Sequence, residues 1–147
     1  MHAAFVKDAP YEPERQLIYQ ALILYADILK TVFTAPVLWI DGGFVTHKHW
    51  EAPKDADVVV VVPWVEYSNV CTDPKSLAYR TLQGVQVQDP PAAVPRVQPM
   101  GGLIDGFIIP DQPLQTAPWH NIWSRVKDDN GNVLPATERK GYLEVQL

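Results

Sequence analysis

VLWIDGGFVTHKHWEAPKDADVVVVV, residues 37–62, carries the clearest structural pattern in the chain. Its first five residues form a short apolar run that stops at Gly42-Gly43. Its last five, Val58–Val62, are an unbroken β-branched run followed by Pro63, which is typical of a strand buried on both faces. The stretch therefore predicts two strands joined by a glycine turn and a polar loop.

Two carboxylates stand at the start of the second predicted strand, where Asp55 and Asp57 flank Ala56. Residues two apart in a strand point to the same side, so both carboxylates are expected to project together. Like charges side by side are unfavourable unless a positive charge lies between them, and a divalent cation is the usual solution. Gly42 and Gly43 lack a Cβ, so their backbone N–H groups can approach phosphates closely.

This arrangement resembles the signature of the DNA polymerase β-like nucleotidyltransferase superfamily, in which a glycine turn precedes an Asp-x-Asp strand. The likeness is strongest to its small minimal bacterial and phage members. In that superfamily the glycine turn holds the nucleotide phosphates, the paired aspartates bind Mg²⁺ (or Mn²⁺), and a carboxylate on a later strand completes the metal site. Asp105, within the apolar stretch GLIDGFII at 102–109, matches that third carboxylate.

The resemblance implies an enzyme that moves a nucleoside monophosphate from ATP or another nucleoside triphosphate to an acceptor hydroxyl. The acceptor is a protein, an RNA end or a small molecule, and small relatives often act in toxin–antitoxin or phage–host conflict. Asp105, or a water-bridged carboxylate pair, is a candidate general base. The implied catalytic and metal-binding residues are Asp55, Asp57 and Asp105.

The loop between the glycine turn and the carboxylates contains further candidates. Lys48 or Lys54 could pair with the triphosphate as a point charge, so both are predicted to bind nucleotide together with the glycines. His47 and His49, with nearby Glu51, suggest an alternative, because imidazole suits zinc and copper. No cysteine pair supports a structural zinc site.

A second hypothesis is a non-catalytic nucleotidyltransferase-like interaction protein that binds a nucleotide or a host or partner protein. Gly43 stands where many active members have serine, which removes a hydroxyl that could contact a phosphate. The two hypotheses differ in geometry: an enzyme needs Asp55, Asp57 and Asp105 to converge on one metal. Asp41, at the end of the first strand, is expected to face the wrong way for this role.

Composition restricts the remaining choices. The 147 residues suit a single domain, 1–147, and the formal net charge of −5 argues against broad nucleic-acid binding through the phosphate backbone. The single Cys71 suits a reducing compartment. Because there is no apolar run of about 18 residues and no signal-peptide layout, we expect a cytoplasmic protein without a membrane partner.

The rest of the chain predicts a mixed α/β sheet with helices packed mainly on one face. A helix is expected from Pro13 to about Phe33, with Leu17 among its buried residues. The other predicted elements are helices at 74–83 and 116–127, a short edge strand at 85–88, a surface loop or extended segment at 89–100, strands at 103–109 and 141–147, and a turn at 128–132.

Overall fold

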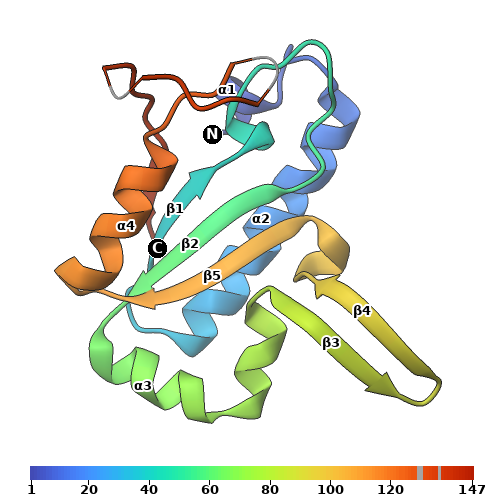
Figure 1. The fold of residues 1–147 in the computed structure, drawn as a ribbon, viewed down its shortest axis with the longest axis vertical. Coiled ribbons are helices and arrows are strands. Elements are labelled where there is room, and N and C mark those ends of the chain that lie inside the picture. Colours follow the sequence, from blue (N-terminus) through green and yellow to red (C-terminus); the bar gives the residue numbers. More distant parts are fainter. Residues whose placement is uncertain (129–130, 136) are drawn as a thin grey trace.

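A four-stranded mixed sheet with the order β5-β2-β1-β6 forms the body of the protein (Figure 1). The computed structural model describes residues 1–128, 131–135 and 137–147. The central strand β2 pairs antiparallel with β1 and parallel with β5, and β1 pairs antiparallel with β6. The four strands are β1 (Val37–Asp41), β2 (Ala56–Val62), β5 (Ile104–Pro110) and β6 (Leu143–Gln146).

Helices cover both faces of this sheet, which explains the valine run. The long helix α2 (Glu12–Val32) packs on the face that carries Val58 and Val60, while α4 (Pro113–Trp123) covers the face that carries Val59. All three valines are fully buried. The short helices α1 (His2–Phe5) and α3 (Trp64–Thr72) add side chains to the α2 cluster. The predicted mixed α/β class is confirmed, with α1, α2 and α3 on one face of the sheet and α4 on the other.

The predicted N-terminal helix forms, but its buried face begins with a different residue. Leu17 is 53% exposed, so the prediction that it is buried was wrong. Arg15, three residues before the buried Ile18, is fully buried instead. The inward stripe of α2 therefore starts on a charged side chain.

A two-stranded hairpin, β3 (Leu82–Gln88) and β4 (Pro91–Val97), projects from the body of the protein (Figure 1). The surface loop or extended segment predicted at 89–100 contains the extended strand β4. Prolines are tolerated in a strand at a sheet edge, where a missing N–H breaks no ladder bond, and among the described strands β4 pairs with β3 alone.

The segment before the hairpin is also shorter and tighter than predicted. Residues 74–83 do not form one α-helix: a 3₁₀ helix at Pro74–Tyr79 precedes β3. Its predicted cap is confirmed, because the Asp73 carboxylate accepts the Lys75 backbone N–H at 2.9 Å. Helix formation stops where the Thr81 N–H donates to the Gly106 carbonyl of β5 at 2.8 Å.

Towards the C-terminus the helix is displaced from its predicted position, since α4 runs from Pro113 to Trp123 rather than over 116–127. The predicted last strand is confirmed as β6. The predicted turn at 128–132 includes residues 129 and 130, which lie outside the described residues. Two short 3₁₀ helices, Gly43–Val45 and Met100–Gly102, precede β2 and β5. Among the described helices, none is long and apolar enough to cross a membrane.

Candidate functional site

Three aspartates lie in one row across three neighbouring strands, and we call them the acidic row. Asp57 on β2 is opposite Asp41 on β1 and opposite Asp105 on β5. Directly opposed residues point to the same face of a sheet. This is the α4 face, since Trp39 and Phe107, two residues along their strands, contact the α4 cluster. The expectation that Asp41 faces the wrong way was therefore incorrect.

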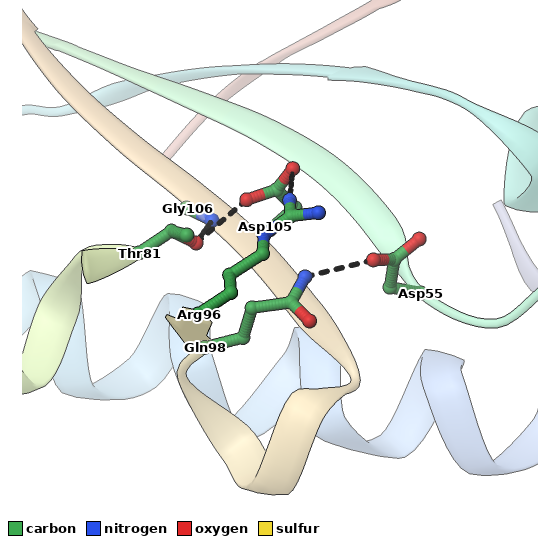
Figure 2. A network of polar contacts seen from close by, with 6 residues as sticks. All are labelled: Asp55, Thr81, Arg96, Gln98, Asp105 and Gly106. Atoms are coloured by element: carbon green, nitrogen blue, oxygen red, sulfur yellow. Dashed lines mark hydrogen bonds and ion pairs between the residues drawn. The ribbon is translucent and has the colours of Figure 1, made fainter. Parts of the chain in front are cut away.

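Asp105 is held by two polar side chains from the region of the hairpin (Figure 2). The Thr81 hydroxyl donates to Asp105 Oδ1 at 2.6 Å, and the Arg96 guanidinium forms an ion pair with Asp105 Oδ2. Asp55, immediately before β2, accepts a hydrogen bond from Gln98 Nε2 at 2.8 Å. The chain just before β3 and the chain at the end of β4 therefore both contact the predicted metal-binding carboxylates.

The two ends of the acidic row are neutralised and its centre is not. Asp41 pairs with Lys140, as Asp105 does with Arg96. The pKa of Asp57 is raised from 3.8 to about 7. Burial is the largest cause of this shift, and the negative charges of Asp55, Asp105 and Asp41 add to it. Asp57 is therefore protonated over a wider pH range than an ordinary carboxyl group, and added positive charge would favour its ionised form.

Arg96 marks where positive charge is stabilised in this site. Its pKa is raised above the ordinary value, and the hydrogen bond to Asp105 is the largest cause. The negative charges of Asp105, Asp55 and Asp57 raise it further. One cation therefore interacts with all three predicted metal ligands at once.

Among the described residues, no group of three or more His, Cys, Asp and Glu side chains is arranged to hold a metal ion.

Gly42 allows the Asp57 carboxylate to occupy its position. Its φ of +83° lies in the region that favours glycine, and a Cβ added there would overlap Asp57 Oδ2. Gly43 differs, because a Cβ on it would meet only Pro53, at an ordinary contact distance of 3.5 Å. A side chain at position 42 would therefore clash with Asp57, whereas position 43 has room for a Cβ.

Gly42→Ala is expected to lower the free energy of unfolding by about 1–3 kcal/mol, because the new Cβ displaces Asp57 and strains the backbone. Gly43→Ala, the matched control, should stay within about 0.5 kcal/mol of the wild type. Urea denaturation of both variants measures the difference. Equal stability of the two variants would show that the Asp57 carboxylate does not lie against Gly42.

Arg15 fixes the backbone that follows the glycine turn, and sequence reasoning missed it. Its guanidinium donates to the carbonyl oxygens of Phe44 and Thr46, and its Nε donates to that of Pro10, each at 2.6 Å. Burial lowers the pKa of Arg15. The available signal was a charged residue in helical register with the apolar face of α2, at the position three before Ile18.

A pocket of about 140 Å³ brings together several of the predicted nucleotide-binding residues. Gly43, Lys48, Lys54 and Asp55 all line it. Lys54 is 82% exposed in its side chain and pairs with Glu51 at 3.1 Å. Two cationic side chains therefore lie at a pocket that begins on the glycine turn and ends on a predicted metal ligand.

The two loop histidines contact the N-terminal region. His47 Nε2 lies 2.9 Å from the Ala4 carbonyl oxygen, and the His49 carbonyl accepts the Tyr11 hydroxyl at 2.8 Å. The His47 contact occupies Nε2 of its imidazole, and the His49 contact is made through its backbone carbonyl. The loop is thereby attached to the body of the protein on the side of α1.

Comparison with known proteins identifies a family and nothing closer. No curated protein and no solved structure matches the chain. The model of a family of unknown function, DUF6932, matches residues 1–146, and the chain belongs to that family.

Proposed function

We propose that the protein is a Mg²⁺-dependent nucleotidyltransferase that transfers a nucleoside monophosphate from a nucleoside triphosphate to an acceptor hydroxyl. The observation that carries the proposal is the position of Asp57, beside Asp105 in register and two residues after Asp55. Its pKa of about 7 reflects burial and surrounding negative charge. A divalent cation bound there would stabilise the ionised form of this carboxyl group.

The Asp55, Asp57 and Asp105 side chains are not arranged around one metal in this structure, so the proposal requires them to rearrange when a cation binds; the support is that the charge of the Arg96 guanidinium is stabilised by all three. In this proposal Asp55, Asp57 and Asp105 hold Mg²⁺, which stabilises the charge that develops on the α-phosphate and on the leaving pyrophosphate. Asp105 is also our candidate for accepting the proton of the acceptor hydroxyl.

The pocket at Gly43 suits the phosphate end of the nucleotide. Lys48 and Lys54 supply positive charge there, next to Asp55. With about 140 Å³ the pocket is smaller than the roughly 300–1,000 Å³ of sites that enclose a whole organic ligand. The base and sugar are therefore expected to lie outside it. The net charge of −5 favours a protein or a small molecule as acceptor over a long nucleic acid.

A thermal-shift panel of the four nucleoside triphosphates, each with and without Mg²⁺, tests the proposal. A nucleotide present at 100 times its dissociation constant should stabilise the fold by about 2.7 kcal/mol. The shift should require Mg²⁺ and vanish in the Asp55→Asn, Asp57→Asn double variant. Asp27→Asn on the exposed side of α2 is the control and should respond like the wild type. The absence of a shift with every nucleotide would reject the proposal.

A second candidate is a non-catalytic interaction protein, and the Arg96–Asp105 ion pair is the observation that favours it. In that case the Arg96 guanidinium is the permanent positive partner of Asp105, in the place that a metal ion would take in an enzyme. The hairpin, whose strands are largely exposed, would then be available to a partner. Failure of the nucleotide panel together with capture of a defined partner that requires the hairpin would support this candidate.

A further inference from the structure

Lys48 is a half-buried cation at the pocket beside the glycine turn. Among the described residues, no hydrogen bond or ion pair engages its ammonium group, whereas Lys54 pairs with Glu51 at 3.1 Å. Asp55, at the other end of the pocket, accepts a hydrogen bond from Gln98. Removing an ammonium group from water is costly unless an anion compensates. Lys48 is therefore the charge in this pocket that is available to an anionic ligand.

Trp50 is a large exposed side chain immediately beside the same pocket. It follows Lys48 by two residues and precedes Glu51, and both of these residues line the pocket. Tryptophan is highly buried on average, yet Trp50 is 61% exposed. Among the described residues, neither cluster of the hydrophobic core includes Trp50, and no aromatic ring packs against it. The described part of the fold therefore does not use this indole for packing.

The other tryptophans differ from Trp50 in this respect. Trp64 is also exposed, at 53%, but its ring lies against Tyr67 on the same helix, with 5.9 Å between the ring centroids. Trp39 and Trp123 are buried in the cluster beneath α4, and Trp119 packs against it. Trp50 is thus the tryptophan whose surroundings leave it available to a ligand.

The backbone on both sides of Trp50 is held in place. The Tyr11 hydroxyl donates to the carbonyl of His49 at 2.8 Å, and the ion pair with Lys54 ties Glu51 to the end of the loop. A ligand that stacks on a side chain presented by a fixed backbone loses less affinity to the ordering of the protein. The loop therefore presents the indole next to the pocket at low entropic cost.

We propose that Trp50 is the stacking surface for the base of the nucleotide whose phosphates bind at Gly43 and Lys48. The inference rests on the proposed function, because it assumes that the pocket binds a nucleoside triphosphate. Since the pocket is too small to enclose the base and sugar, these groups lie on the surface beside it. Every nucleobase has an aromatic face, so stacking tolerates all of them. Trp50 therefore supplies affinity for the nucleoside without selecting the base.

Trp50→Ala should weaken the binding of ATP and leave the binding of tripolyphosphate unchanged. In calorimetric titrations with Mg²⁺ at pH 7.5, the dissociation constant of ATP should rise at least about 5-fold, the lower end of what one stacked base contributes. Tripolyphosphate carries similar anionic groups without a base. Trp50→Phe keeps an aromatic face and should recover most of the lost affinity. Trp64→Ala removes the other exposed indole and should match the wild type with both ligands.

The outcomes separate this inference from the proposed function. If Trp50→Ala binds ATP as tightly as the wild type does, or loses the same factor for tripolyphosphate, the inference is overturned while the nucleotide pocket stands. Failure of Trp50→Phe to recover affinity would also overturn it. If the wild type does not bind ATP, the proposed function is rejected, and the inference with it. Circular dichroism and the thermal unfolding midpoint of each variant establish that the fold is intact before the titrations are compared.

Discussion

Arg15→Met should lower the free energy of unfolding by at least about 3 kcal/mol, because it leaves buried carbonyl groups without a donor. The guanidinium is fully buried and donates to the buried carbonyl of Phe44 and to the partly buried carbonyls of Thr46 and Pro10. Methionine fills part of the volume but offers no N–H. Urea denaturation followed by fluorescence measures the loss.

Two variants identify the cause of that loss. Arg15→Lys keeps the charge but lacks the fork that reaches several acceptors, so it should be destabilised as well. Lys30→Met on the exposed side of the same helix removes a charge from an exposed ion pair with Asp27 and should cost less than about 1 kcal/mol. A similar small loss for Arg15→Met would contradict the role assigned to Arg15 in supporting the glycine turn.

Asp57→Asn is expected to stabilise the protein at pH 8 while abolishing metal binding. The pKa of Asp57 is raised to about 7, so the folded protein holds a proton that the unfolded chain loses near pH 4. The stability that Asp57 contributes is therefore fully present below about pH 4 and is lost as pH rises through about 7. Asparagine stays neutral and avoids that loss, but it removes a charged group from the proposed metal site.

The measurement is chemical denaturation of both proteins between pH 4 and pH 8, paired with a Mn²⁺ titration at pH 7.5. The stability difference should grow with pH and reach at least about 1 kcal/mol in favour of Asp57→Asn, since one pKa unit corresponds to about 1.4 kcal/mol. Asp27→Asn should follow the wild type in both experiments. A pH-independent difference would show that Asp57 does not titrate in this range.

The strands and the position of the candidate site were predictable because their signals are local. A β-branched run such as Val58–Val62 has few alternatives to a buried strand, and two aspartates at i and i+2 share a face in any strand. The structure brings Asp57 and Asp105 into register on one face. The sequence also indicated a close approach at Gly42, and the structure places the Asp57 carboxylate there.

The remaining features depend on contacts between distant parts of the chain. Asp41 joins the acidic row only because β1 pairs with β2 in one particular register, which the sequence of a single strand does not specify. Arg15 finds its partners on a turn 28 to 31 residues further along. Arg96 lies in a proline-rich segment that predicted a loop or an extended segment, and its contact with Asp105 follows from the hairpin that forms there.

Mn²⁺ is the most direct probe of the acidic site, because its anomalous scattering locates it within a crystal. Crystals grown with Mn²⁺ and a non-hydrolysable nucleoside triphosphate should show an anomalous peak about 2.1 Å from oxygens of Asp57 and Asp105 and phosphates at Gly43. A structure with bound nucleotide elsewhere and no peak at these carboxylates would contradict a metal-dependent transferase site.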